Sequence, residues 1–370
     1  MVGMDPTLAH IVDQVAQAVS QKTALRIRGG GSKDFHGQCL QGTVLDTRAL
    51  SGIVAYEPSE LVVTARCATP LRELEARLAQ QGQCLPFEPP HFGAAATLGG
   101  MVAAGLSGPA RVSSGAVRDY VLGLQMVNGR AEVLQFGGQV MKNVAGYDVS
   151  RLMVGSLGVL GLITELSLKV LPRPPAEVTL LFASSQAQAL RMLQGWAAQP
   201  LPVNASCWHA DRGGQLHLRL RGAKAAVAAA CVSLGGQQLA DSVATEFWAA
   251  LREQTLPVFA LTDAQCLWRL SVPDTAPVLE LPAPATDPLV EWGGALRWVK
   301  APASSSTALR AAVAAVGGTA SIFRRGSDAR EQEVAVFHPL AATNLRIQRA
   351  LKLQFDPAGI FNPARLYPQL

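Results

Sequence analysis

The sequence predicts an α+β protein of two domains, and three observations lead to that fold class. The chain has 370 residues, more than one domain usually contains. Pro172, Pro174 and Pro175 interrupt it after a series of short strand and helix patterns. Beyond these prolines, strand and helix patterns alternate over residues 178–324, in an order that favours one antiparallel sheet with helices on a face.

The composition is that of a folded, weakly basic chain. Hydrophobic residues make up 49% and charged residues 16%, and the mean hydropathy is +0.20. These values exclude a disordered protein, because they supply enough apolar surface for a large core. The net charge of +5 comes without a run of five Lys or Arg residues, so an anionic cofactor or a partner protein explains it at least as well as a nucleic acid does.

The spacing of the cysteines limits the metal sites that the chain can hold, and the lengths of its apolar runs limit its relation to a membrane. Six cysteines are scattered without C-x-x-C spacing, which argues against an iron–sulfur cluster or a structural zinc ion held by this chain alone. No signal peptide is evident, and no apolar run reaches the roughly 18 residues of a membrane span. We therefore expect reduced thiols, no metal, and a cytoplasmic protein that reaches a membrane only through a partner.

A glycine-rich turn follows the first predicted strand. Apolar residues recur at helical spacing over residues 8–19, and residues 24–28 have the pattern of a short strand. The turn that follows consists of Gly29, Gly30, Gly31, Ser32 and Lys33. Successive glycine amides can surround an anion, and the hydroxyl and the cation suit the same ligand. The turn is neither a Rossmann fingerprint nor a Walker A loop, and a merely flexible turn is the alternative.

A second glycine-rich stretch spans residues 89–115. It contains Gly93, Gly99, Gly100, Gly105, Gly108 and Gly115. Each glycine costs conformational entropy when the chain becomes ordered. So many of them in a chain of good core composition favour close approach of the backbone to a large ligand, over a loop that only turns often.

The other predicted elements complete the two domains. In the first domain, strands are expected at 43–46, 53–57, 61–67 and 162–171, a helix from Thr69-Pro70 to Gly82, and a hairpin of residues 120–127 and 131–136 around Asn128-Gly129. In the second, strands are expected at 178–182, 204–210, 214–221, 267–272, 295–300 and 319–324, and helices at 184–198, 223–234, 241–254 and 306–316. The tail at 355–363 is rich in apolar and turn residues, so we expect it to dock against a domain.

Five motifs together resemble one family. They are Arg28-Gly-Gly-Gly-Ser32, Thr97-Leu-Gly-Gly100, Lys142-Asn-Val-Ala-Gly-Tyr-Asp148, the segment 155–165 and the tail 355–363. In this order they resemble the vanillyl-alcohol-oxidase flavoproteins, whose FAD domain is called PCMH-type. Within that family the chain is most similar to the FAD-binding subunits of glycolate oxidase, also named glycolate dehydrogenase. The resemblance covers residues 20–172 and the last fifteen or so residues well, and is loose between them.

The resemblance implies a fold and a domain division. It implies an α+β architecture in which a PCMH-type FAD-binding domain of two subdomains occupies residues 1–172. An α+β cap domain with an antiparallel sheet follows at 173–350. The tail at 351–370 then returns to the FAD domain.

The resemblance also implies which residues bind FAD. Residues 28–33 match the pyrophosphate loop, and residues 97–100 match a second loop against the diphosphate and the isoalloxazine. The implied cofactor-binding residues are Arg28, Gly29, Gly30, Gly31, Ser32, Lys33, Pro90, Thr97, Leu98, Gly99, Gly100, Ser107, Gly108, Ser114, Gly115 and Ile163. Glycine backbone suits a diphosphate, which needs several donors and no nearby carboxylate.

The sequence departs from the family at two places. Many members tether FAD through a His in the glycine loop, where this chain has Ser32-Lys33, so we expect non-covalent FAD. Hydroxy-acid dehydrogenases of the family also carry closely spaced His residues in the cap, and none of the six His here forms such a pair. His338 is the only one in the corresponding region, and a structural role is the alternative for it. Lys142 and Tyr147 are further weak catalytic candidates, and a packing role is the alternative for Tyr147.

The resemblance implies a flavin-dependent oxidoreductase acting on the CH–OH group of a 2-hydroxy acid. We expect an FAD-binding subunit that oxidises glycolate to glyoxylate together with a second FAD subunit and an iron–sulfur subunit. A self-sufficient FAD-dependent 2-hydroxy-acid dehydrogenase is one alternative, against which the missing cap histidines argue. A structural partner that has lost catalysis is the other, against which the intact glycine loops argue.

Overall fold

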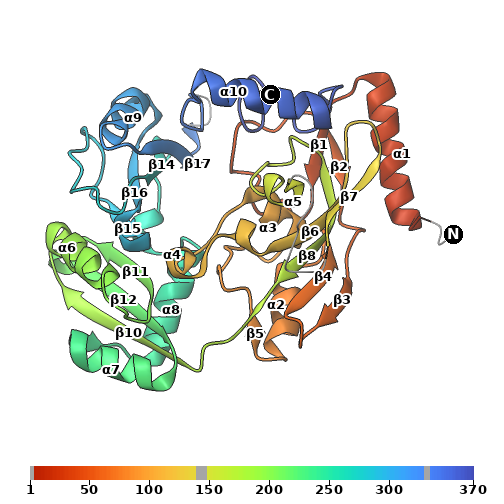
Figure 1. The fold of residues 1–370 in the computed structure, drawn as a ribbon. Coiled ribbons are helices and arrows are strands. Elements are labelled where there is room, and N and C mark those ends of the chain that lie inside the picture. The colour runs from red at the N-terminus through yellow and green to blue at the C-terminus, as the bar shows by residue number, and fades with distance from the viewer. Residues whose placement is uncertain (1–3, 139–147, 329–333) are drawn as a thin grey trace. The chain divides into compact units, whose positions relative to one another are not determined.

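The structure is a computed structural model that describes residues 4–138, 148–328 and 334–370. It confirms the α+β class (Figure 1). The chain forms two compact units. The first consists of Met1–Leu106, Ala116–Pro172 and Pro339–Leu370, and the second of Ser107–Gly115 and Arg173–His338. This division differs from the expected one in two places, because residues 107–115 group with the second unit and residues 339–350 with the first.

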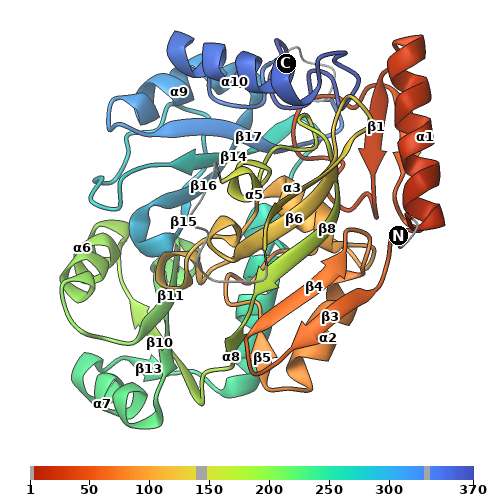
Figure 2. The same ribbon diagram turned by 45° about the vertical axis from the view of Figure 1, so that its right-hand side comes forward.

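The first unit begins with a small parallel sheet and a helix. Strand β1 (Leu25–Arg28) pairs in parallel with β2 (Thr43–Asp46). Helix α1 (Pro6–Gln21) lies alongside β1 in both ribbon views (Figure 2). Its apolar stripe of Leu8, Ile11, Val15 and Ala18 packs in one cluster with the strand residues. The helical spacing seen in the sequence is therefore the buried face of α1.

A larger antiparallel sheet forms the rest of the first unit. Its strand order is β3-β4-β8-β6-β7. The strands are β3 (Ile53–Glu57), β4 (Val62–Arg66), β6 (Val121–Val127), β7 (Val133–Gly137) and β8 (Leu162–Lys169), and the helices that accompany them are α2 (Leu71–Ala79), α3 (Leu98–Ala104) and α5 (Val149–Leu152). A two-stranded ribbon joins β5 (Gln83–Cys84) to β9 (Leu171–Pro172). The core of this unit includes Leu71, Leu74 and Leu78 of α2, all fully buried.

The hairpin of β6 and β7 is present, but its loop is longer than a two-residue Asn-Gly turn. Val127 pairs with Val133, so five residues connect the strands. The side chain of Asn128 organises the loop by accepting hydrogen bonds from the amides of Arg130 and Glu132, at 2.9 and 3.0 Å. Gly129 is needed for another reason, because a Cβ there would lie 2.3 Å from Oδ1 of Asp356 in the tail.

The second unit contains one antiparallel sheet of eight strands, in the order β13-β10-β12-β11-β15-β16-β14-β17. The strands are β10 (Ala176–Ala183), β11 (Val203–His209), β12 (Gln215–Gly222), β13 (Gln237–Gln238), β14 (Gln265–Ser271), β15 (Leu289–Glu291), β16 (Leu296–Pro302) and β17 (Thr319–Arg325). The helices are α4 (Arg111–Ser114), α6 (Gln186–Ala197), α7 (Lys224–Leu234), α8 (Asp241–Arg252) and α9 (Ser306–Ala314). Short 3-10 turns are η1 (Val117–Asp119) in the first unit, and η2 (Asp211–Gly213), η3 (Pro257–Phe259), η4 (Trp292–Gly294) and η5 (Ala303–Ser305) in the second.

Strand β12 shows how this sheet is covered. Leu216, Leu218 and Leu220 alternate along it and pack with apolar residues of α6 and α7. The residues between them face the other way, where Phe247 of α8 stacks on His217. Helices therefore cover both faces of this sheet, whereas the sequence predicted helices on one face.

The C-terminal tail docks onto the first unit, as the sequence predicted. After α10 (Ala342–Phe355), the amide of Leu25 donates to the carbonyl of Ile360 at 2.7 Å. The buried Lys352 donates through Nζ to Oδ2 of Asp356 at 2.7 Å and to the carbonyl oxygens of Val159 and Phe361. Asp356 in turn accepts from two tail amides. The ion pair and its hydrogen bonds therefore fix the tail against the segment before β8, and the bond to Ile360 attaches it to β1. Within the described ranges, no helix combines the length and apolarity that crossing a membrane requires.

Candidate functional site

A cavity in the first unit brings the two glycine-rich loops together. It lies among β1, the turn after it, the start of α3, the segment before β8 and the tail. The residues that line it are Ile27, Arg28, Gly29, Gly30, Gly31, Ser32, Lys33, Asp34, Leu40, Thr47, Cys67, Thr97, Gly99, Gly100, Ala103, Ala104, Leu157, Gly158, Gly161, Leu162, Ile163, Asn362 and Arg365. Ten of the residues predicted to bind FAD are therefore found in one cavity.

The glycines of the first loop are required by its contact with the second loop. A Cβ on Gly30 would lie 1.5 Å from the carbonyl oxygen of Ala95, and one on Gly29 would lie 2.8 Å from Oγ1 of Thr97. Gly31 has a φ of 71°, a conformation that favours glycine. The backbones of the two loops thus touch each other, and any larger residue would separate them. These glycines, predicted from the sequence to contact only the ligand, therefore also have a packing role.

The charged groups of the cavity include a carboxylate, although a diphosphate site was expected to have none nearby. Asp34 lines the cavity, but it is paired with Arg28 Nε at 3.0 Å and with Arg26 at 3.4 Å. The Nζ atom of Lys33 donates to the carbonyl oxygen of His91 at 3.1 Å. Since two guanidinium groups offset Asp34 and Lys33 adds a further cation, the cavity keeps a positive balance that suits a diphosphate.

The tail completes the cavity with two residues that sequence reasoning missed. Asn362 accepts from the amide of Ile27 at 2.8 Å and donates to the carbonyl of Leu157 at 2.6 Å. Arg365 donates to the carbonyl oxygens of Asp34 and His36. The tail therefore braces both the strand before the glycine turn and the chain after it. The motif Phe-Asn-Pro was noticed in the sequence, and only its place in space was unknown.

These residues fit an FAD. Glycine backbone, the Ser32 hydroxyl and the Lys33 ammonium suit a diphosphate, while Ile27, Leu157 and Ile163 offer apolar surface to a ring system. Cys67 also lines the cavity, and burial raises its pKa to about 12, so the residue is a neutral thiol. The cavity thus offers donors for an anion beside surface for an aromatic group.

The remaining predicted FAD-binding residues lie elsewhere. Pro90 is buried outside the cavity, and Leu98 is fully buried in the core of the first unit. The other four, Ser107, Gly108, Ser114 and Gly115, belong to the segment that groups with the second unit. Their roles toward FAD stay predictions.

Of the three candidate catalytic residues, only His338 belongs to the described part of the chain. Lys142 and Tyr147 lie outside the described residues. Asp148, next to them, caps α5 by accepting from the amide of Arg151 at 3.1 Å. His338 accepts through Nδ1 from the amide of Ala320 at 3.3 Å, and burial together with the charge of Arg310 lowers its pKa. These contacts match a structural role for His338.

The second unit holds two arginines against one indole ring. The guanidinium carbon of Arg111 lies 4.5 Å from the ring centre of Trp292, and that of Arg269 lies 5.1 Å from it. Trp292 has a φ of 55°, which is unusual for a bulky residue, and its Nε1 donates to the carbonyl of Gly108 at 3.1 Å. Burial and the charge of Arg111 lower the pKa of Arg269 to about 10, while Glu291 acts against them. Two cations beside a strained aromatic residue can bind a small carboxylate.

The structure also pairs two histidines that the sequence did not show as a pair. The rings of His209 and His217, on neighbouring strands, stack at 5.2 Å, and Phe247 stacks on His217 at 3.8 Å. Burial, with the charge of His209, lowers the pKa of His217 to about 3. The pair comes from cross-strand pairing, which single-sequence spacing cannot reveal. Among the residues with described positions, no group of three or more His, Cys, Asp or Glu could hold a metal ion.

Comparisons with known proteins agree with this geometry. Residues 7–137 match the FAD binding domain family, so the chain has an FAD-binding domain. The chain is 48% identical over 360 residues to the glycolate oxidase subunit GlcE of Escherichia coli (strain K12), which covers 97% of each protein. It is 32% identical over 156 residues to the glycolate oxidase subunit GlcD of Bacillus subtilis (strain 168), covering 42% of this chain and 33% of that protein.

A solved structure shares the fold. Alkyldihydroxyacetonephosphate synthase superposes with a TM-score of 0.67 and 16% identity, over 96% of this chain and 75% of that one. At that identity the likeness concerns the fold alone. It supports the PCMH-type arrangement that the five sequence motifs implied.

Proposed function

Because the chain belongs to the family of FAD-binding proteins that includes the E. coli glycolate oxidase subunit GlcE, we propose that it is the FAD-binding subunit of a glycolate-oxidising complex. The observation that carries this proposal is the 48% identity over 97% of both chains. The complex would contain a second flavoprotein and an iron–sulfur subunit, and its product would be glyoxylate. The cysteines of this chain are compatible with that division, since they are scattered and hold no cluster motif.

The cavity of the first unit is the proposed FAD site. The loops at 29–33 and 97–100 would hold the diphosphate through backbone amides, with Lys33 adding positive charge. When bound, FAD would accept two electrons from the substrate and pass them on singly. Ser32 and Lys33 stand where tethered relatives have a His, so the flavin would be non-covalent. Acid precipitation should then release yellow flavin to the supernatant, and flavin retained in the pellet would contradict this.

Arg111 and Arg269 are the proposed groups for the substrate carboxylate. Both guanidinium groups contact Trp292. Burial chiefly, and the charge of Arg111 in addition, lower the pKa of Arg269, and a carboxylate beside the two groups would offset the repulsion from Arg111. The stacked histidine pair is not assigned as the base, because Phe247 covers it and burial disfavours its charged form. We therefore propose that this chain binds the acid but does not turn it over efficiently alone.

Turnover measurements test the proposal. Glyoxylate formation from glycolate would be followed with one artificial acceptor, for this chain alone and for the chain reconstituted with the second flavoprotein and the iron–sulfur subunit. We expect efficient turnover only from the reconstituted complex. A single chain that matches the rate of the complex would favour the self-sufficient dehydrogenase instead. A chain that binds neither partner would refute the subunit role.

A further inference from the structure

Hydrogen bonds hold the short segment that carries Arg111 on both sides of that residue. On one side, the indole Nε1 of Trp292 donates to the carbonyl oxygen of Gly108 at 3.1 Å. On the other side, Oγ of Ser113 donates to the carbonyl oxygen of Asn204 at 2.8 Å and accepts from its Nδ2 atom at 3.0 Å. The guanidinium group of Arg111 lies over the same Trp292 ring. All of these residues belong to the second unit, so Arg111 is attached to that unit from both ends of its segment.

Helix α4 is too short to fix Arg111 by itself. It has four residues, from Arg111 to Ser114, and none of them is buried. Val112, next to Arg111, is 62% exposed. A helix of one turn has little stability of its own, because most helical stability comes from the packing of a buried face. The position of Arg111 therefore depends on the contacts that its neighbours make with the sheet.

Asn204 stands at an irregularity of β11. The pairing of β11 with β12 shifts register between Val203 and Ala205, so Asn204 is the extra residue of a bulge. Bulges are frequent next to active sites, where they redirect a side chain. The buried side chain of Asn204 contacts both Ser113 and Arg219. It therefore links α4 to β12.

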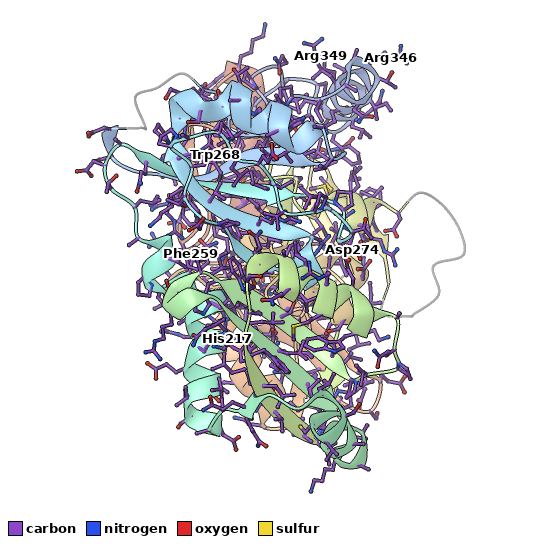
Figure 3. All side chains as sticks on the ribbon, turned by 90° about the vertical axis from the view of Figure 1, so that its left-hand side faces the viewer. His217, Phe259, Trp268, Asp274, Arg346 and Arg349 are labelled. Carbon is purple, nitrogen blue, oxygen red and sulfur yellow. The ribbon has the colours of Figure 1, made fainter. Side chains whose placement is uncertain are left out.

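Arg219 fixes the orientation of the Asn204 amide. It lies two residues beyond His217 on the same strand (Figure 3), and only 2% of it is exposed. Its Nε donates to Oδ1 of Asn204 at 2.8 Å, so the Nδ2 atom of that amide is directed to Ser113. Its guanidinium carbon lies 4.7 Å from the ring centre of Trp248 on α8. A buried cation is costly unless its hydrogen bonds are satisfied, so this arrangement permits little movement.

From these contacts we propose that Ser113, Asn204 and Arg219 are positioning residues that hold Arg111 in the geometry in which it binds the substrate carboxylate. Each of the three acts through Arg111 and does not itself contact the substrate. A binding group that is held in place before the ligand arrives loses less conformational entropy when the ligand binds. This inference rests on the proposed function, because it explains how one of the two proposed carboxylate-binding arginines is held.

Oxalate binding to the FAD-loaded full chain, measured by isothermal titration calorimetry, tests the inference. Ser113→Ala is the principal variant, because Ser113 is exposed and its replacement leaves the core intact. Loss of one net hydrogen bond corresponds to about a fivefold change in affinity, so oxalate should bind about fivefold more weakly. Ser113→Thr keeps the hydroxyl and should bind oxalate as the wild type does. The affinity for FAD and the midpoint of thermal unfolding should be the same in both variants.

Two further variants separate positioning from general destabilisation. Asn204→Ala removes the acceptor of Arg219, so it should weaken oxalate binding at least as much as Ser113→Ala and should also lower stability. Ser185→Ala removes the N-cap of α6 in the same unit. It should lower stability without changing the affinity for oxalate.

The Arg111→Met variant shows whether oxalate binds at the proposed site. If this variant loses oxalate while Ser113→Ala and Asn204→Ala bind it as the wild type does, the positioning role is wrong and the carboxylate site stands. If oxalate does not bind the wild type, or binds Arg111→Met equally well, the proposed carboxylate site fails and this inference fails with it. If Ser113→Thr or Ser185→Ala weakens binding as much as Ser113→Ala does, the loss does not come from the hydroxyl of Ser113, and the inference is overturned.

Discussion

Replacement of Gly100 by Asp tests whether the cavity of the first unit holds the diphosphate of FAD. Gly100 lines the cavity near the start of α3 and has no positive φ. A Cβ there would meet only Oγ1 of Thr97, at 3.1 Å. A side chain at Gly100 needs Thr97 Oγ1 to move by only a few tenths of an ångström, whereas a Cβ on Gly30 would lie 1.5 Å from the carbonyl oxygen of Ala95. This makes a charge substitution at Gly100 interpretable.

The expected effect follows from electrostatics. A carboxylate about 6 Å from a diphosphate of charge −2 is repelled by about 1.4 kcal/mol in water and by about 5.5 kcal/mol at an effective dielectric constant of about 20. Because solvent reaches the cavity, we expect a repulsion energy between these two values, of about 1.5–3 kcal/mol. That range corresponds to a roughly 10- to 100-fold weaker affinity for FAD.

The assay is a titration of the flavin-free full chain with FAD, followed by quenching of flavin fluorescence. Gly100→Ala is the matched control, because it adds the same Cβ without charge and improves helix propensity by about 0.5–1 kcal/mol. We expect Gly100→Ala to bind FAD nearly as the wild type does. Equal affinity of the Asp and Ala variants would refute the placement of the diphosphate at this wall of the cavity.

Three further predictions concern the ion pair of the tail, the arginine pair and the histidine stack. Lys352→Met removes the cation that pairs with the buried Asp356, so the free energy of unfolding should fall by about 3–5 kcal/mol. Thermal unfolding measures this loss, and an unchanged midpoint temperature would contradict the prediction. Arg269→Met should abolish oxalate binding to the full chain, because it removes one of the two guanidinium groups beside Trp292; binding that is insensitive to this change would exclude Arg269 as a ligand. The pKa of His217 is about 3 in the folded chain and near 6.5 in the unfolded chain, so the unfolded state binds more protons between these pH values. The free energy of unfolding should therefore fall as the pH decreases from 6.5 to 3. His217→Phe should flatten that decline, and an identical pH profile of stability in the variant would disprove the lowered pKa of His217.

Local patterns predicted much of the fold and of the candidate site. The two glycine loops were found because glycine is costly unless backbone must approach something closely. The apolar stripe of α1 was found because its spacing matches one face of a helix. Ser32, Lys33 and Thr97 were named together with the loops, and the structure places them in one cavity.

Contacts between distant parts of the chain could not be predicted from the sequence. Asn362 and Arg365 reach the first glycine turn from the opposite end of the chain. The position of Asp34 between two arginines depends on how the turn folds back on β1. The stack of His209 and His217 depends on strand register. Each of these is set by tertiary pairing, which the composition and spacing of one segment do not encode.

The attachment of the tail has a consequence for how the protein is made. Leu25 of β1 bonds to Ile360, and Ile27 bonds to Asn362. A ribosome adds residues one after another, and early segments fold as they emerge. Strand β1 cannot form these hydrogen bonds with the tail until more than three hundred later residues have been translated. Nascent chains should therefore remain unable to retain flavin until synthesis is nearly finished, and prematurely terminated products should never acquire it.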